Sequence, residues 1–235
     1  MTKKLLIFAF VAFSTISIAQ QGTNSPYSFY GLGSLKFKGT VENQSMGGLS
    51  VYSDSIHLNL KNPASYAGTN LAFYNNESRP VKFSIGTNFS STTLETTTAS
   101  DEYGSSSISY LAVALPIKKF GIGFGLLPYT SVGYKLQSLN DDDLLQYRYR
   151  GEGGLNRTFF GLGYQLSKSL KIGLDVQYNF GSIINTSIAF GYTDQGLPLQ
   201  YQSREEKRSE LGGVSYNFGI AYKKNTSDQG PSHPE

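Results

Sequence analysis

The chain has 235 residues with 26 Gly, 17 Tyr and 15 Phe, no Cys and no Trp, and a formal net charge of +3. The missing cysteines exclude a disulfide framework and thiolate chemistry, and the small, scattered charge argues against nucleic-acid binding. The mean hydropathy is -0.27, and no run after the N-terminus offers the ~18 apolar residues of a spanning helix, which excludes a helical membrane protein.

Residues Met1–Ala19 have the features of a signal peptide. Two lysines at positions 3 and 4 precede the apolar run Leu5–Phe13, and the small-x-small sequence S-I-A ends before Gln20, the expected mature start. The apolar run is too short for a membrane anchor. We therefore expect an exported protein.

The segment Gln20–Gly68 does not alternate like a strand. Its glycines at positions 31, 33, 47 and 48 permit tight, positive-φ backbone, and Asn62-Pro63 favours an extended or turn geometry. Non-helical backbone at membrane depth must be buried in protein or face water. The sequence predicts a compact N-terminal hatch or plug over residues 20–68, inside a barrel.

The stretch Ser169–Phe180 alternates strictly between apolar and polar side chains. Its apolar residues are Leu170, Ile172, Leu174, Val176, Tyr178 and Phe180, and the residues between them are Lys171, Gly173, Asp175, Gln177 and Asn179. Successive side chains of a strand point to opposite faces, so one face is apolar and the other polar. This pattern is typical of a strand between lipid and a wet lumen.

Similar alternation recurs through residues 69–224 and predicts six long strands. The predicted strands are Pro80–Glu95, Ile108–Ile117, Phe120–Leu136 with a bulge at Pro128, Leu155–Leu166, Leu170–Tyr192 and about Leu199–Lys223. The polar stretches Thr96–Ser107 and Gln137–Gly154 are predicted as long external loops. The dipeptides Lys118-Lys119 and Ser167-Lys168 are predicted as short periplasmic turns.

The polar row of these strands should face the lumen. The predicted lumen-facing residues are Lys82, Lys171, Asp175, Gln177 and Asn217. They either line a permeation path or pair with the plug, and both interpretations stay open. Inward glycines at 121, 123 and 125 would leave space for something that fills the barrel.

The predicted fold class is all-β, an antiparallel transmembrane β-barrel or the N-terminal part of a larger one. Six strands fall below the ~8 of natural single-chain barrels, and residues 225–235 form a polar tail without a terminal aromatic. We therefore expect a C-terminally truncated chain, with an open edge at Val214–Lys223.

No catalytic or metal-binding constellation stands out. His57 lies beside Asp54 and Ser55, but adjacency in sequence does not assemble a triad. Asp141–Asp143 lacks the ligand spacing and turn glycine of a calcium loop, so a solvated loop is favoured. We expect no enzyme activity, no cofactor and no metal.

The N-terminal segment resembles that of the FadL-like outer-membrane proteins, in their uncharacterised Bacteroidetes-type branch. The residues that carry the resemblance are Met46, Gly47, Gly48, Asp54, Asn62, Pro63 and Ala64. The resemblance implies a fourteen-stranded barrel whose lumen is plugged by these hatch residues.

It also implies passive uptake of hydrophobic small molecules such as fatty acids or hydrocarbons. The alternative is a non-transporting structural barrel in an outer-membrane or secretion complex. The expected location is the outer membrane, with lipid, a hydrophobic ligand and the barrel-insertion machinery as partners. A transporter needs a continuous apolar pocket behind the hatch, whereas a structural barrel can be packed shut.

Overall fold

The computed structural model describes residue 23 and residues 25–51, 57–68, 81–95, 100–193 and 195–223. The predicted signal peptide, Asp54 and the tail at residues 225–235 lie outside the described residues. No helix in the described part of the chain is long and apolar enough to cross a membrane.

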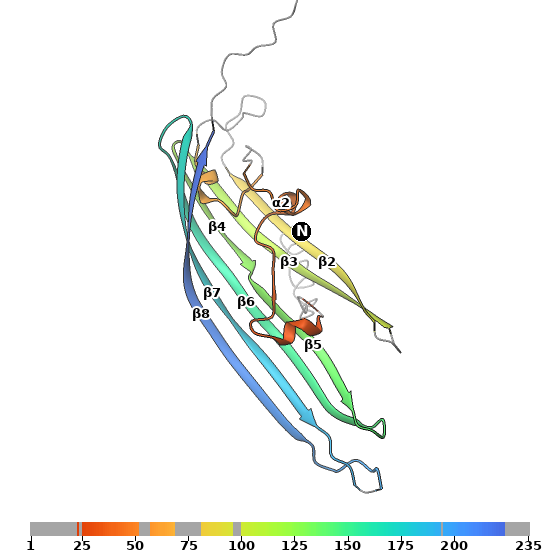
Figure 1. The fold of residues 1–235 in the computed structure, drawn as a ribbon. Helices are drawn as coiled ribbons and strands as arrows, with labels where there is room; N and C mark the ends of the chain where they lie inside the picture. Colours follow the sequence, from red (N-terminus) through yellow and green to blue (C-terminus); the bar gives the residue numbers. More distant parts are fainter. Residues whose placement is uncertain are drawn as a thin grey trace, which may run out of the picture.

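The described strands form one antiparallel sheet that curls into a half-barrel (Figure 1). The long strands are β2 (Lys82–Glu95), β3 (Ser100–Ile117), β4 (Phe120–Pro128), β5 (Thr130–Leu139), β6 (Leu145–Gln165), β7 (Leu170–Ala189) and β8 (Ser203–Tyr222). Neighbours in the sheet run β2–β3–β4–β6–β7–β8, and β5 also pairs with β6. The predicted all-β, antiparallel class is confirmed.

The predicted strand Phe120–Leu136 is divided at Tyr129 into β4 and β5. Both parts pair with β6, and the Tyr129 amide still donates to the Leu155 carbonyl at 2.7 Å. Pro128 has no amide hydrogen to continue the ladder, so the break follows from its chemistry. Beyond this point β3 pairs only with β2, and the β2–β3 hairpin diverges from β5 (Figure 1).

Both predicted long loops are wrong in extent. Residues 100–107 belong to β3, and the connection between β5 and β6 is only residues 140–144. Backbone pairing continues through these polar stretches because Tyr103, Tyr147 and Tyr149 favour strands and both faces can be hydrated there. The strands therefore run well beyond the apolar part of the sheet.

The two faces of the sheet differ as the alternation predicts. On β7 the apolar residues from Ile172 to Phe180 are each more than a third exposed on the convex face, whereas Asp175 and Gln177 are buried on the concave face. The apolar row from Leu170 to Phe180 covers roughly 33 Å of strand, which is about 25 Å of height at a tilt of about 40°. That height matches the apolar band of an outer-membrane barrel.

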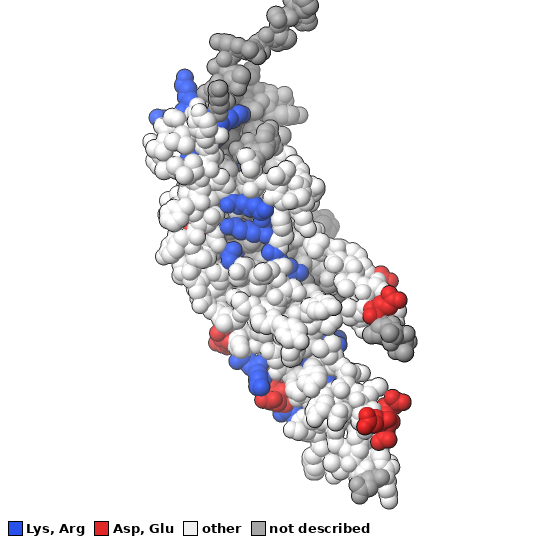
Figure 2. Space-filling model, in the orientation of Figure 1, with Lys and Arg blue, Asp and Glu red and all other residues white. Residues whose placement is uncertain are grey.

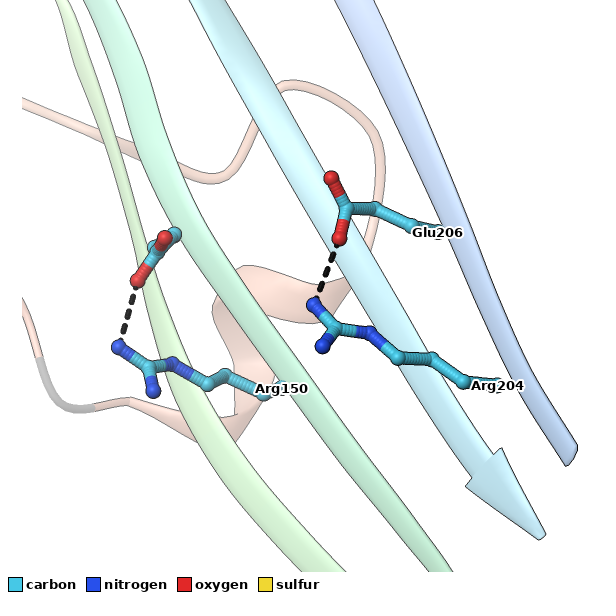
Figure 3. A network of polar contacts seen from close by, with 4 residues as sticks. Arg150, Arg204 and Glu206 are labelled. Carbon is cyan, nitrogen blue, oxygen red and sulfur yellow. Dashed lines mark hydrogen bonds and ion pairs between the residues drawn. The ribbon is translucent and has the colours of Figure 1, made fainter. Parts of the chain in front are cut away.

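Beyond the end of this apolar band, the convex face carries charged side chains. Arg150 pairs with Glu152 on β6 and Arg204 with Glu206 on β8, each at 2.7 Å (Figure 3). All four side chains are well exposed, so each pair contributes little stability. Their position indicates where the convex face stops being apolar.

The N-terminal residues 25–51 and 57–68, which we call the plug, lie against the concave face (Figure 1). The plug contains η1 (Pro26–Phe29), β1 (Ser34–Leu35), α2 (Val41–Ser45) and η2 (Pro63–Tyr66). Thr40 caps α2 in a reciprocal capping box with Asn43. The short β1 pairs with β5, at the edge that β3 leaves free.

There are two buried apolar clusters: the first joins the plug to the sheet, and the second lies within the sheet. The first contains Leu58, Leu60, Tyr66, Tyr110, Ala112, Ala114, Leu127 and Phe159, and the second contains Val132, Tyr134, Leu155 and Ile183. Three members of the first cluster belong to the plug. The inward face of the sheet is therefore partly apolar, and the plug covers part of that apolar surface.

Candidate functional site: the plug and its docking surface

The turn η2 is built by the sequence N-P-A-S-Y. Asn62 is the N-cap, and its side-chain oxygen accepts from the Ala64 amide at 3.0 Å. Pro63 stands in the first turn, where its missing amide hydrogen costs nothing. The Ser65 hydroxyl donates to the Asn62 carbonyl at 2.7 Å. Local sequence thus fixes a tight, closed turn.

A row of four glycines lies beneath this turn. Gly121, Gly163, Gly173 and Gly219 are direct cross-strand partners on β4, β6, β7 and β8. We call this row the glycine floor.

The glycine floor leaves no room for side chains. A Cβ atom on Gly121 would lie 2.0 Å from the Tyr66 carbonyl oxygen, and one on Gly173 would lie 2.3 Å from the Ala64 nitrogen. On Gly219 it would lie 2.0 Å from the Asn62 side-chain oxygen. Three of these glycines let the plug backbone approach the wall backbone, and Gly219 makes room for the Asn62 side chain, so a larger residue would have to displace the plug.

The Tyr66 ring packs against the wall two residues along β4 and β6 from the glycine floor. It lies over Gly123 and Gly161, where added Cβ atoms would come within 2.6 Å and 2.7 Å of the ring. Tyr66 is 4 % exposed, and its hydroxyl has no hydrogen-bond partner among the described residues. Burial raises the pKa of Tyr66 above its usual range, and the negative charge of Asp175 adds to the effect.

Hydrogen bonds tie the plug to both edges of the half-barrel. At the β2 edge, the Lys82 ammonium donates to the His57 carbonyl at 3.1 Å. At the β8 edge, the Asn217 amide donates to the Lys61 carbonyl at 3.1 Å, and the Asn62 amide donates to the Ile220 carbonyl at 3.0 Å. The residues 57–62 therefore bridge the first and last long strands of the sheet.

Asp175 is the most deeply buried charged side chain of the wall among the described residues, at 1 % exposure. Its two oxygens accept from the Gln177 amide and, at 2.9 Å, from the Asn217 amide. Asn217 thus joins the buried carboxylate to the plug backbone. Such a carboxylate is tolerated because its acceptor sites are filled.

The Met46-Gly47-Gly48 sequence ends α2 with a turn. Gly47 and Gly48 have φ values of 68° and 87°, and the Gly48 amide donates to the Asn43 carbonyl at 2.7 Å. The Lys61 ammonium donates to the Gly48 carbonyl at 2.8 Å, which links this turn to the residue before Asn62.

The structure brings most of the predicted residues into one contact region. Asn62, Pro63 and Ala64 lie on the glycine floor, Lys82 and Asn217 bond the plug, and Lys171 packs against Gly68, whose added Cβ would lie 2.4 Å from the Lys171 nitrogen. Gln177 donates to Asp175, whose other oxygen accepts from the plug-bound Asn217. Met46 is exposed at the end of α2 and stays outside this contact region.

Sequence reasoning missed several members of the site. The alignment of Gly163 and Gly219 depends on strand register, which the sequence of one strand does not specify. Arg157 also faces inward: its Nε donates to the Asn179 side chain at 2.7 Å. The alternation of Leu155–Leu166 would have placed Arg157 on the inner row.

The arrangement covers part of the concave face by close packing. Within the described part of the chain, no three His, Asp or Glu side chains gather as metal ligands. Asp141–Asp143 lies in the β5–β6 turn, where the Asp142 amide is bonded by Asn140.

A family model, BamG, matches residues 1–231. No curated protein and no solved structure matches the chain. The predicted membership of the FadL-like superfamily is wrong, because BamG is a family of a different kind, a component of the Bam complex. The M-G-G and N-P-A sequences on which the resemblance depended form turns that close α2 and fit the glycine floor. Different plugged barrels can share such turns, because any plug must end its helix and pack closely against the wall.

Proposed function

Because the chain belongs to the BamG family, we propose that it is a non-transporting subunit of the outer-membrane complex that assembles β-barrel proteins. In this role the convex face is embedded in lipid, and the barrel-assembly machinery is its partner. The role needs no bond chemistry, so we propose no enzymatic activity.

The observation that carries the non-transporting role is the fit of η2 on the glycine floor. Backbone-to-backbone packing, with hydrogen bonds at β2 and β8, makes the plug part of the folded wall. A plug that opens for each passing molecule would have to break these contacts and expose Asp175 and Tyr66. The fixed plug therefore favours a structural subunit over an uptake channel.

Depletion of the chain in its own cells tests this function. The rate at which newly exported barrel proteins become heat-modifiable should fall several-fold, because assembly loses a subunit. Uptake of a labelled long-chain fatty acid should change only after assembly fails. Early loss of uptake with normal barrel assembly would contradict the proposal.

A further inference from the structure

Basic side chains of the plug and of β6 gather on the concave side of the molecule, where the plug lies against the sheet. Figure 2 shows Lys and Arg side chains gathered in the middle of this face, whereas the visible Asp and Glu lie mainly toward the lower strand ends. The described plug residues contain three lysines, at 36, 38 and 61, and one acidic residue, Glu42.

Three cations of this surface are close to one another. Lys38 lies within electrostatic reach of Lys61, Arg157 and Asp175. The Lys61 ammonium is 4.7 Å from the centre of the Phe37 ring, and the Arg157 guanidinium is 4.0 Å from that of Tyr129. These ring contacts hold two of the cations in place.

The cluster has more positive charge than its surroundings neutralise. Asp175 is the nearby carboxylate, and its oxygens are already engaged by Gln177 and Asn217. Arg157 is only 9 % exposed, and within the described residues hydrogen bonds reach it only at Nε. Burial lowers the pKa of Lys38, which indicates a charge that would gain from an anionic partner.

Large apolar side chains on the same plug segments as these lysines are exposed. Leu35 is 71 % exposed beside Lys36, and Leu49 is 64 % exposed after Gly48, whose carbonyl binds Lys61. Val41 and Met46 of α2 and its cap are about half exposed. Exposed apolar residues grouped around charges are typical of a protein-binding surface.

We propose that Lys38, Lys61, Arg157, Leu35 and Leu49 form a docking surface for an acidic, apolar polypeptide segment of another subunit of the assembly complex. This inference rests on the proposed function. Charge complementarity selects an acidic segment, and the leucines favour a polypeptide over a small anion. Membrane lipid is the poorer candidate, because the apolar band is on the opposite, convex face of the sheet.

Lys38→Glu is the direct test, with Lys135→Glu as its matched control. Lys135 is exposed on β5 and alternates with the inward-facing Tyr134 and Leu136, so it carries the same charge change to the convex face. In mild detergent, Lys38→Glu should lower the co-purification of the other complex subunits about tenfold, and Lys135→Glu should leave it unchanged. Lys38→Gln should give an intermediate loss, and circular dichroism should show that all variants are folded.

A second arm uses defined probes on the purified full chain. A twelve-residue peptide of alternating Glu and Leu should bind, more weakly at high salt and about tenfold more weakly to Lys38→Glu. Equal binding of that peptide to both charge variants would overturn the inference. So would binding of inorganic phosphate or phosphatidylglycerol vesicles with the same sensitivity to Lys38→Glu.

The two arms separate this inference from the proposed function. If the wild-type chain brings down no assembly subunits, the proposed function fails, and the peptide arm still decides whether the surface selects acidic polypeptide. If the wild-type chain brings them down and Lys38→Glu does so equally, the docking surface is wrong and the function stands.

Discussion

At the scale of single residues, the plug depends on the absence of side chains in the wall. A Cβ on Gly173 would meet the Ala64 nitrogen at 2.3 Å and the Pro63 carbonyl carbon at 2.4 Å, and backbone atoms cannot rotate away. Gly213, on β8, has nothing within 4 Å of its added Cβ. Alanine at Gly173 therefore tests the contact with the plug, and alanine at Gly213 is the matched control.

We predict that Gly173→Ala lowers the free energy of unfolding by about 2 kcal/mol through overpacking. Gly213→Ala should leave it unchanged or slightly raised, since alanine restricts the unfolded chain more than glycine. Urea midpoints followed by circular dichroism in detergent compare the two variants. Equal midpoints would show that the plug does not press on the glycine floor.

Asn62 has two separable roles, as the cap of η2 and as a donor to the Ile220 carbonyl. Asn62→Ser should keep a cap acceptor but be too short to reach Ile220, whereas Asn62→Ala should lose both bonds. Each lost bond should cost about 1 kcal/mol. Protease cleavage of the plug should therefore be slowest in wild type, faster in Asn62→Ser and fastest in Asn62→Ala. If protease cleaves the plug of Asn62→Ser and Asn62→Ala at the same rate, the cap contributes nothing and Asn62 stabilises the plug only through its bond with Ile220.

Tyr66 makes a pH dependence testable. Its pKa is raised in the folded state, so above the ordinary tyrosine pKa of 10.0 the unfolded chain releases this proton first. The contribution of Tyr66 to stability is thus intact below about pH 10 and is lost as pH rises further. Tyr66→Phe should remove this loss. At pH 8 its stability should equal or exceed that of wild type, because the hydroxyl has no partner among the described residues.

Urea midpoints of wild type and Tyr66→Phe at pH 8 and pH 11 measure that difference. The other tyrosines are the same in both proteins, so their titration cancels in the comparison. A wild-type chain that loses no more stability than Tyr66→Phe between the two pH values would show that the ring is not desolvated.

At the scale of elements, the plug and the sheet behave as one packed unit. The residues 57–62 bridge β2 and β8, η2 lies on the glycine floor, and β1 extends the ladder at β5. This differs from a hatch that opens, which needs weak contacts along at least one side.

A disulfide between plug and wall tests this difference in a chain without native cysteines. An added Cβ on Gly163 would lie 3.1 Å from the Ala67 Cβ, short of the 3.5–4.5 Å of a disulfide, and 2.8 Å from the Pro63 carbonyl oxygen. Gly163→Cys combined with Ala67→Cys should cross-link in the oxidising periplasm once the plug shifts away from the glycine floor by several tenths of an ångström, and both the oxidised and the reduced form carry this overpacking. We predict that the locked chain supports barrel assembly as well as the reduced one. Loss of function on oxidation, restored by reduction, would show that the plug must move.

The long strands and their two faces were predictable because alternation of side chains is a local property. The six predicted strands coincide with β2, β3, β4 together with β5, β6, β7 and β8. The extent of β3 and β6 was not predictable, since the polar stretches 100–107 and 145–154 can hydrogen-bond to water or to a neighbouring strand.

The site was predictable only in part. The inward residues Lys82, Asp175 and Asn217 follow from parity, but their partners in the plug depend on how the chain folds back. The glycine floor needs four strands in one register, which no single stretch encodes. The predicted family was wrong because the M-G-G and N-P-A sequences specify the turns of a plug. Such turns do not indicate the function of the barrel.

At the scale of the whole molecule, the described chain is a curled sheet with an apolar convex band on one face and its own N-terminal segment on the other (Figure 1). An apolar convex band suits the outer membrane, and a basic, apolar plug surface suits a protein partner. Together with membership of the BamG family, these surfaces agree with the proposed role as a non-transporting subunit of the barrel-assembly complex.

The most direct measurement is affinity purification of the tagged chain from outer membranes solubilised in mild detergent, with the bound proteins quantified by mass spectrometry. We predict that the barrel-assembly subunits are recovered with it in a fixed ratio, and that the ratio persists through size-exclusion chromatography. Recovery of the chain free of those subunits, while the assembly complex purifies intact without it, would contradict the account.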